Sequence, residues 1–539
     1  MKVLLILPTF GYNHGYPNFF SNSDFPTGFA YLASAIKTGG HQVVGLNPNN
    51  EPGYKSARDM VDSKISHCLL EDKPDLIGLG GLSTDYHFIR DALETIRDEA
   101  PETPVVLGGG IVENDPEFVF SNLHPDFCIE GEAEETIVEL INVLESGEGD
   151  YGQIANLAYW EEGNAVFTKR DFNYIHLDDR AFPDYEPFGM DNMLDKYSLA
   201  TRYVYRYVRP NPRVMTIVSA RGCPFTCTFC IHGRVETRTY RVRSMDSLME
   251  EIRTLYDRYQ FNILIILDEL FIAKKGRLKE FCLALKEEKQ KYKWDFNWIF
   301  QTHANSDIDY EIFEMAKKEG CYTFTYGLES ASPRVLESME KKSKLPEIVK
   351  AIEMADKLGL GFYASFIFGD LAENEETIEE TMDFFSSHCT DLHLNFAAIS
   401  PYPGSMLFPA TQDKGLIVDK KQYYETIDEQ IYNMTSMRNR IYFPWVYLVM
   451  YLGQFYQYAK STRASYFEKD LEATASNPIA LHQRKAIYKV KATCPHCEHE
   501  NSYTELLEDE REVGSGEKIE TAILTEETLR NPAHDPSYV

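Results

Sequence analysis

Short apolar runs alternate with longer amphipathic segments over the first 150 residues. Buried parallel strands form continuous apolar runs, whereas helices repeat their apolar positions every three or four residues. We therefore expect strands at 3–7, 41–46, 75–80, 104–107 and 127–130, and helices at 28–38, 56–70, 86–99, 116–122 and 132–145. This pattern predicts a flavodoxin-like, doubly wound α/β domain over residues 1–150 whose ligand site lies at the carboxyl ends of the strands.

The alternation weakens over residues 151–213, which we interpret as a connector, and resumes over 214–417. Six further apolar runs, each followed by a helical stretch, predict strands at 214–219, 263–267, 296–301, 323–327, 363–368 and 392–397. Six strand–helix units in about 200 residues predict a partial (β/α)6 barrel. In such barrels the reactive groups lie at the carboxyl ends of the strands.

The carboxy-terminal part differs in composition from both α/β regions. Residues 418–497 are expected to be mainly helical, with an aromatic stretch at 442–458. Residues 498–539 carry 12 acidic against 3 basic side chains, which predicts a flexible acidic tail.

Composition narrows the class of protein. The 539 residues are 43% hydrophobic and carry a formal net charge of −30, as expected of a folded multidomain protein without broad affinity for nucleic acid. No apolar run is long enough to cross a membrane, and the apolar start of the chain is too short for a signal peptide. A cytoplasmic location is expected.

Three of the ten cysteines stand together directly after the first strand of the predicted barrel. Cys223, Cys227 and Cys230 have the spacing C-x3-C-x2-C. Three such thiolates can bind three irons of a [4Fe–4S] cluster and leave the fourth iron open for another ligand. A zinc site would need a fourth ligand, for which His232 is the nearest candidate. Three ordinary buried cysteines remain a further alternative.

This loop resembles the radical S-adenosylmethionine (SAM) superfamily, whose motif is C-x3-C-x-aromatic-C with Phe229 as the aromatic residue. The resemblance implies that Cys223, Cys227 and Cys230 hold a [4Fe–4S] cluster whose open iron chelates the amino and carboxylate groups of SAM. One electron, from an external flavodoxin-like or ferredoxin-like reductant, then cleaves SAM to a 5′-deoxyadenosyl radical. The protein would position the cofactors and exclude water.

Other strand ends fit the same resemblance. It implies that Asp268 or Glu269 accepts from the SAM ammonium, that Glu329 and Ser330 contact the ribose, and that Ile367 and Gly369 contact the adenine. The fifth strand departs from the family pattern, because Ser365 stands where glycine is usual and Glu373 lies one position late. Each acidic residue, taken singly, is equally well explained as a solvated residue at the start of a helix, where Asp and Glu are favoured.

The amino-terminal region resembles the cobalamin-binding domain of cobalamin-dependent radical SAM enzymes. The resemblance rests on loops rich in small residues and on an acidic run at 130–136. It implies contacts with cobalamin from the residues Thr9, Ser83, Thr84, Gly108, Gly109, Gly110, Glu130, Gly131 and Glu132. Alternatively, these glycines and hydroxyls only form turns and caps.

A cobalt-ligating D-x-H-x-x-G motif is absent. His14 has Tyr12 and Pro17 at the aspartate and glycine positions. The resemblance therefore implies cobalamin with a detached dimethylbenzimidazole tail and no histidine from that motif on cobalt.

Two further patterns have no assigned role. Nine arginines lie between Arg202 and Arg243, where they could bind an anion or pair with acids of this acidic chain. Cys494 and Cys497 resemble half of a zinc ribbon, or form a plain turn.

The resemblance as a whole implies a methyltransferase that acts on an unactivated carbon or a phosphorus atom of a small molecule. A second possibility keeps both cofactors but performs a cyclisation or rearrangement, and a third is a corrinoid or iron–sulfur sensor. Methyl transfer by a radical route requires the two cofactors to share one cavity. We therefore expect the carboxyl ends of both sheets to face each other.

Overall fold

The structure is a computed structural model of the chain. It describes residues 1–508 apart from 10–11, 13–24, 50–53, 55, 197–208, 210–211, 234–239, 274–275, 304–308, 390–392, 428, 462–463, 470–484 and 494–499. These residues form two compact units, Met1–Gln454 and Phe455–Val539. The first unit contains both predicted α/β regions.

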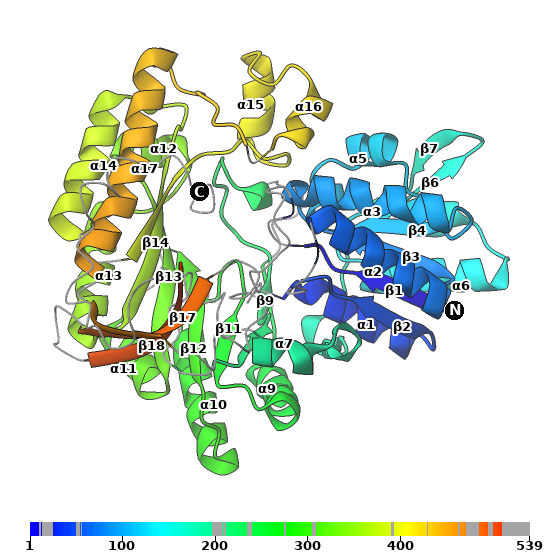
Figure 1. Ribbon diagram of the computed structural model, residues 1–539, viewed down its shortest axis with the longest axis horizontal. Helices are drawn as coiled ribbons and strands as arrows, with labels where there is room; N and C mark the ends of the chain where they lie inside the picture. Colours follow the sequence, from blue (N-terminus) through cyan, green and yellow to red (C-terminus); the bar gives the residue numbers. More distant parts are fainter. Residues whose placement is uncertain are drawn as a thin grey trace. The chain divides into compact units, whose positions relative to one another are not determined.

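The first sheet has the strand order β2-β1-β3-β4-β5-β6-β7 (Figure 1). Its first five strands are parallel, in the order of a flavodoxin-like fold, which confirms the predicted class. The strands are β1 (Lys2–Ile6), β2 (Gln42–Leu46), β3 (Leu76–Gly80), β4 (Val105–Gly108), β5 (Phe127–Ile129), β6 (Leu157–Glu161) and β7 (Asn164–Phe167).

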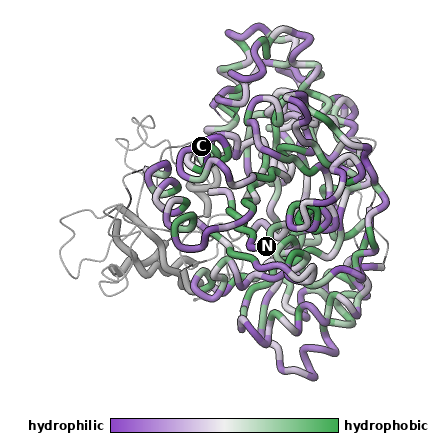
Figure 2. Tube along the Cα trace, turned by 90° about the vertical axis from the view of Figure 1, so that its right-hand side faces the viewer, coloured by the Kyte–Doolittle hydropathy of each residue, from purple (hydrophilic) through white to green (hydrophobic). Residues whose placement is uncertain are grey.

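Helices cover both faces of this sheet. They are α1 (Thr27–Thr38), α2 (Ala57–Asp72), α3 (Tyr86–Glu99), α4 (Gly110–Asn114), α5 (Pro116–Leu123) and α6 (Glu134–Ser146), with α7 (Met190–Lys196) further along the chain. Apolar residues of α1 and α6 belong to one buried cluster, and those of α2, α3 and α5 belong to another. Figure 2 shows hydrophobic segments in the interior of the trace and hydrophilic segments along its outside.

Strands β6 and β7 differ from the expected connector. They form an antiparallel hairpin that extends the first sheet beyond β5. The turn consists of Glu162 and Gly163, both with positive φ, as a tight two-residue hairpin requires. The Glu-Gly pair was the sequence signal available for this hairpin, but its strands are too short to show a clear alternation of apolar and polar residues.

The second sheet contains six parallel strands in the order β15-β14-β13-β12-β11-β8, as expected of a partial barrel. Each lies within a few residues of a predicted strand. Their bounds are β8 (Val214–Ile217), β11 (Ile263–Ile266), β12 (Asn297–His303), β13 (Cys321–Glu329), β14 (Gly361–Phe368) and β15 (His393–Ala398). A separate two-stranded ribbon pairs β9 (Ala220–Arg221) with β10 (Arg241–Val242).

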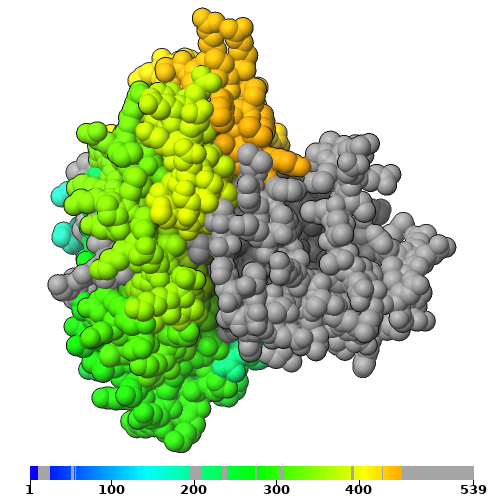
Figure 3. All heavy atoms as spheres, turned by 90° about the vertical axis from the view of Figure 1, so that its left-hand side faces the viewer, coloured from blue at the N-terminus to red at the C-terminus, as the bar shows by residue number. Residues whose placement is uncertain are grey.

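The barrel helices follow their strands and cover the outside of this sheet. They are α9 (Met245–Tyr259), α10 (Arg277–Tyr292), α11 (Tyr310–Lys318), α12 (Pro333–Ser338), α13 (Leu345–Leu358) and α14 (Glu375–His388). Helix α17 (Asn439–Ser461) starts beside α14, where the Trp445 indole donates to Glu375 over 3.2 Å. Figure 3 shows this contact region as orange atoms on the yellow-green surface.

The segment after the barrel packs against the first domain. It contains α15 (Leu407–Asp413) and α16 (Lys420–Glu425). Asp115, just before α5, pairs with Lys420 at 2.6 Å and accepts from the Tyr424 hydroxyl over 3.0 Å. The Tyr424 ring also stacks on Phe118. These contacts hold the first domain and the end of the barrel together within the first unit.

The carboxy-terminal region is less helical than the sequence suggested. Helix α17 confirms the aromatic helix, but three antiparallel strands follow it: β16 (Ala464–Lys469), β17 (Lys485–Thr493) and β18 (Glu500–Glu508). Strand β18 lies within the range expected to be a flexible tail. Long-range strand pairing overrode the helical and acidic composition there. Among the described helices, none is long and apolar enough to span a membrane.

The packing of β3 against β4 generates a stability prediction. Gly109 has φ +85° and ψ −171°, and a Cβ there would lie 2.9 Å from the Gly81 carbonyl oxygen. Gly109→Ala should therefore lower stability by about 1–3 kcal/mol, seen as a lower midpoint of thermal unfolding. Gly28→Ala in α1 is the control, because no atom lies within 4 Å of the added methyl group. Equal midpoints for the two variants would contradict the strain at Gly109.

Candidate functional site

The loop that carries Cys223, Cys227 and Cys230 leaves the barrel after β8 and lies between the ribbon strands β9 and β10. Backbone hydrogen bonds fix its middle: the Thr228 amide donates to the Met339 carbonyl, and the Met406 amide donates to the Thr228 carbonyl, each over 3.0 Å. The loop is therefore held from two sides, by the end of α12 and by the segment after β15.

The three thiols lie close enough together to influence one another's charge. Burial is the main reason that the pKa of each is raised, to about 11 for Cys230. In the described part of the chain, no group of three or more His, Cys, Asp or Glu side chains is arranged around a single metal ion. A [4Fe–4S] cluster places a different demand on the loop than a single ion does, because each cysteine binds a different iron.

Lys341 is a buried cation beside this loop that the sequence analysis missed. It is 7% exposed, its Nζ lies 2.9 Å from Glu329 Oε1, and it sits over the Phe229 ring. Burial alone would lower the Lys341 pKa, but the Glu329 carboxylate and the Cys227 thiol outweigh it and raise the pKa. Lys341 therefore places a fixed positive charge next to the three thiols. Its place in a lysine-rich run, with Lys342 and Lys344, gave no sign of burial.

Asp268 has partners different from those expected. Its carboxylate accepts from the Ser219 amide over 2.6 Å, the Ser219 hydroxyl over 2.5 Å and the Ala220 amide over 3.0 Å. The side chain is 2% exposed, and burial raises its pKa to about 7. Asp268 therefore fixes the residues that lead into the cysteine loop. The neighbouring Glu269 is exposed, and its charge contributes to the raised pKa of Cys223.

The remaining predicted SAM contacts lie in different surroundings. Phe229 and Ile367 pack against the same small apolar cluster, which brings the cysteine loop and the end of β14 together. Ser330 is 2% exposed, and its hydroxyl is bound to the Thr381 hydroxyl and the Ser332 amide. Glu329 takes a positive φ of 64° at a register shift in β13, which aims its carboxylate at Lys341.

Gly369 begins a buried acidic turn after β14. Its amide donates to the Glu373 carboxylate, and the space where a Cβ would stand is filled by the Tyr442 hydroxyl of α17. Glu373 is 1% exposed, and burial raises its pKa to about 8. One oxygen each of Asp370, Glu373 and Tyr442 lacks a hydrogen-bond partner among the described residues. The start of α17 thus closes over the end of β14.

The predicted cobalamin contacts gather at the carboxyl edge of the first sheet. Gly109 packs on Gly81, and the Ile111 amide donates to the Gly81 carbonyl over 2.9 Å, so the loops after β3 and β4 form one rim. Gly108 and Gly110 flank this contact, and Ser83 and Thr84 form a short 3-10 turn beside it. Thr9, after β1, is 1% exposed and its hydroxyl has no partner among the described residues.

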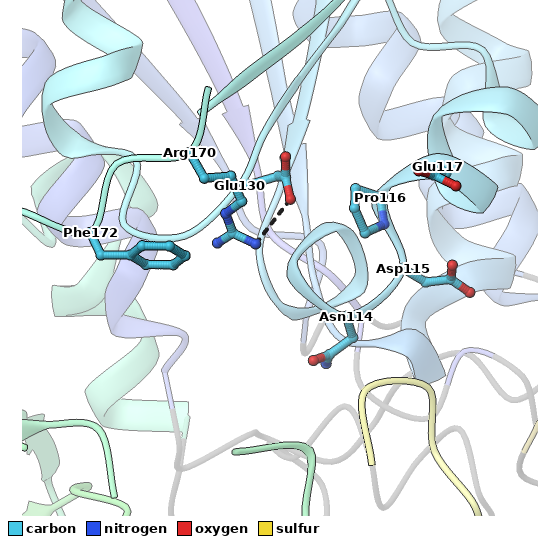
Figure 4. Close-up of a pocket in the computed structure, with 7 residues that line it drawn as sticks. All are labelled: Asn114, Asp115, Pro116, Glu117, Glu130, Arg170 and Phe172. Atoms are coloured by element: carbon cyan, nitrogen blue, oxygen red, sulfur yellow. Dashed lines mark hydrogen bonds and ion pairs between the residues drawn. The ribbon is translucent and has the colours of Figure 1, made fainter. Parts of the chain in front are cut away.

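A cavity of about 520 Å³ opens at the same edge, after β4 and β5. Figure 4 shows the Arg170, Glu130 and Phe172 side chains on one side and the turn from α4 into α5 on the other. Arg170 pairs with Glu130 at 3.0 Å and with Glu113 at 2.7 Å. The residues that line the cavity are Asn114, Asp115, Pro116, Glu117, Glu130, Arg170 and Phe172. Only Glu130 among them was predicted from the sequence as a cobalamin contact.

The loop after β5 also reaches the barrel. Glu132 and Glu134 pair with Arg221 of β9, at 2.8 and 2.6 Å. Near the other end of the barrel sheet, a Cβ on Gly404 would clash with the Asn114 side chain. Loops after β4 and β5 therefore contact loops after β8 and β15, as expected if the carboxyl ends of the two sheets face each other. Gly131, with φ +76°, packs closely against the Tyr174 hydroxyl.

Several predicted residues lie outside the described residues. They are His14, Pro17, Arg202, Arg206, Arg234, Arg238, Cys494 and Cys497. The described arginines of the same stretch mostly pair with acids, for example Arg209 with Asp295 at 2.5 Å and Arg243 with Glu251.

Two protein families match the chain. Residues 23–141 match the B12 binding domain, and residues 217–385 match the radical SAM superfamily. The matched ranges lie within the doubly wound domain and the partial barrel, respectively.

The chain is also similar to individual proteins over most of its length. The chain is 27% identical to an uncharacterized methyltransferase of Pyrococcus horikoshii, over 79% of this chain and 87% of that protein. It is 26% identical to an anaerobic magnesium-protoporphyrin IX monomethyl ester cyclase of Rubrivivax gelatinosus, over 78% and 72%. Its fold resembles that of the radical SAM methyltransferase TsrM from Kitasatospora setae, with a TM-score of 0.61 at 17% identity over 77% and 75%.

The buried Glu373 generates a prediction on pH. Its pKa rises from an ordinary 4.5 to about 8 on folding. The folded protein therefore favours protonated Glu373. This contribution to the free energy of unfolding is fully present below pH 4.5 and is lost as the pH rises through 8, by at most about 1.4 kcal/mol per pH unit. The Glu373→Gln side chain is neutral at every pH. Between pH 5 and 8 the midpoint of thermal unfolding should therefore fall less steeply for this variant than for the parent protein. Parallel pH profiles would show that Glu373 does not titrate in this way.

Proposed function

Because this chain belongs to the cobalamin-dependent radical SAM enzymes, we propose that it is a methyltransferase that acts on an unactivated carbon or a phosphorus atom of a small molecule. It uses a [4Fe–4S] cluster, SAM and cobalamin. When bound, these groups supply a 5′-deoxyadenosyl radical and a methyl donor. The protein's own contribution is to hold them, to shape the space between them and to exclude water.

Cys223, Cys227 and Cys230 are our candidates for the three cluster ligands. Their common loop supports this assignment, as does their closeness, since the negative charge of Cys227 and Cys223 adds to burial in raising the pKa of Cys230. Lys341 would offset part of the negative charge of the thiolates. Glu269, Glu329, Phe229, Ile367 and Gly369 are the candidates for contacts with SAM. Asp268 and Ser330 would support the site indirectly, since each is only 2% exposed and its side chain is bonded within the protein.

The cobalamin would bind at the rim formed by the loops after β1, β3 and β4. The buried hydroxyl of Thr9 supports this placement, because it has no partner among the described residues and a ligand could supply one. Gly81 and Gly109 allow a ligand to approach the backbone closely. Asn114, Glu130 and Arg170, which line the neighbouring cavity, are additional candidates for polar contacts with corrin amides.

One observation carries the proposal of direct methyl transfer: the carboxyl edge of the first sheet touches the base of the cysteine loop. A radical and a methyl donor can act on the same atom only within near-contact distance. The substrate would lie between the two edges, beneath the start of α17. The electron would come from a flavodoxin-like or ferredoxin-like partner.

The similarity to the Rubrivivax gelatinosus cyclase supports a second candidate function, a radical cyclisation that uses both cofactors without transferring a methyl group. SAM with a deuterated methyl group distinguishes the two. The reconstituted protein is reduced and incubated with small-molecule extracts, and the products are analysed by mass spectrometry. We expect 5′-deoxyadenosine together with a product that carries the deuterated methyl group. Deoxyadenosine without labelled product would support cyclisation, and no deoxyadenosine would contradict both functions.

The cluster assignment predicts a specific loss. Replacing Cys223, Cys227 and Cys230 together by alanine should remove the bound iron and sulfide, the broad visible absorbance and all SAM cleavage. Cys68→Ala is the control, since that half-buried cysteine of α2 lies outside the loop. Wild-type iron content in the triple variant would show that the cluster is held elsewhere.

The missing D-x-H-x-x-G motif predicts how cobalamin binds. Electron paramagnetic resonance of the cob(II)alamin form should lack superhyperfine splitting from a lower nitrogen ligand. Such splitting would point to an imidazole ligand on cobalt. If the protein bound no corrinoid, the methyltransferase proposal would fail.

A further inference from the structure

Two arginines stand directly opposite each other at the base of the cysteine loop. Arg221 of β9 and Arg241 of β10 are cross-strand partners in an antiparallel ribbon only two residues long. Side chains of such a pair lie on the same face about 5 Å apart, where like charges repel. A ribbon this short cannot by itself overcome that repulsion. Something outside the ribbon must compensate for it.

The compensating charges come from the first domain. The Glu132 carboxylate accepts from Arg221 over 2.8 Å and from Arg241 on its other oxygen, so it bridges the two arginines. Glu134 accepts from Arg221 over 2.6 Å. The base of the cysteine loop is therefore closed by the acidic run that follows β5.

A third arginine completes this group of charges, which we call the junction. Arg180 lies 2.8 Å from Glu132 and 2.8 Å from Glu134. The side chains of Arg180 and Glu134 are 5% and 11% exposed, and those of Glu132 and Arg221 are below 20%. Burial alone would raise the Glu134 pKa, but Arg221 and Arg180 outweigh it and lower the pKa. Glu134 is thus stabilised in its charged form, and both carboxylates pair with arginines.

We propose that Glu132 and Glu134 are positioning residues that set the conformation of the cysteine loop through Arg221 and Arg241. Arg221 is separated from Cys223 by Gly222 alone, whose φ of +83° makes a sharp turn into the loop. From the other side, Asp268 fixes Ser219 and Ala220. The approach to Cys223 is thereby clamped between a barrel carboxylate and two carboxylates of the first domain. In this proposal Glu132 acts on the loop, a role that differs from the cobalamin contact predicted for it from the sequence.

The proposal rests on the proposed function, since it assumes that the loop holds a cluster that binds SAM. Its test reads the cluster and SAM binding, and does not require a substrate or methyl transfer. Glu132→Gln/Glu134→Gln keeps the size of both side chains but removes their charge. We expect iron and sulfide content to stay at the parental level, because all three cysteines remain.

The measured quantity is the electron paramagnetic resonance spectrum of the reduced cluster during titration with SAM. In the double variant we expect a broadened spectrum and a weaker apparent affinity for SAM, by roughly tenfold, which equals a loss of about 1.4 kcal/mol. Arg221→Gln should give a similar loss. Combining it with the glutamine pair should add little, because the residues act through one contact. Arg221→Lys should restore only part of the SAM affinity that Arg221→Gln loses, since one ammonium group cannot pair with both carboxylates as the guanidinium does.

Arg209→Gln is the matched control from the same arginine stretch. Arg209 pairs with the exposed Asp295 away from the ribbon, so the spectrum and the SAM affinity should not change. If the double variant lost its cluster, the single variant Glu134→Gln would be titrated in its place. An unchanged spectrum and affinity in the glutamine variants would overturn the proposal. A parental protein that holds no cluster at all would instead contradict the proposed function.

Discussion

The junction at the base of the cysteine loop is the contact on which the arrangement of the site depends. Buried ion pairs are costly to form, because each charge must leave water, and costly to break, because a lone buried charge then remains. Glu132, Glu134, Arg180 and Arg221 therefore specify one relative placement of loop and sheet edge more than they add stability. A purely apolar contact would allow the loop to slide along the sheet edge. A radical reaction between two cofactors requires a fixed distance between them and would not tolerate this movement.

Other buried charges repeat this principle around the same loop. Asp268, just after β11, holds the residues between β8 and the ribbon. Lys341 pairs with Glu329 and lies next to the cysteine loop. Asp115, with Lys420 and Tyr424, holds the segment after the barrel on the first domain. In each case a charged side chain from one element fixes backbone or charge on another. Specific pairing thus holds the loops after β8 and after β15, the two edge strands of the barrel sheet, against the first domain.

Much of the fold was accessible from periodicity, and the exceptions have physical reasons. The eleven parallel strands were visible because strands buried on both faces need continuous apolar runs. The hairpin β6–β7 lies at the sheet edge, where short strands need no such run. The sheet formed by β16, β17 and β18 depends on pairing between segments far apart in sequence, which local composition does not encode.

For the site, the sequence by itself determined the chemistry: three cysteines on one loop, small residues at the strand ends of the first sheet, and acids after the barrel strands. These residues are recognisable because their spacing is set within single loops. Only the tertiary structure decided their partners. It turned Asp268 towards Ser219, buried Lys341 beside the cysteines, brought Arg170 to the cavity and set Glu132 against Arg221 and Arg241. Burial and pairing depend on which elements meet across the fold, and no local pattern records that.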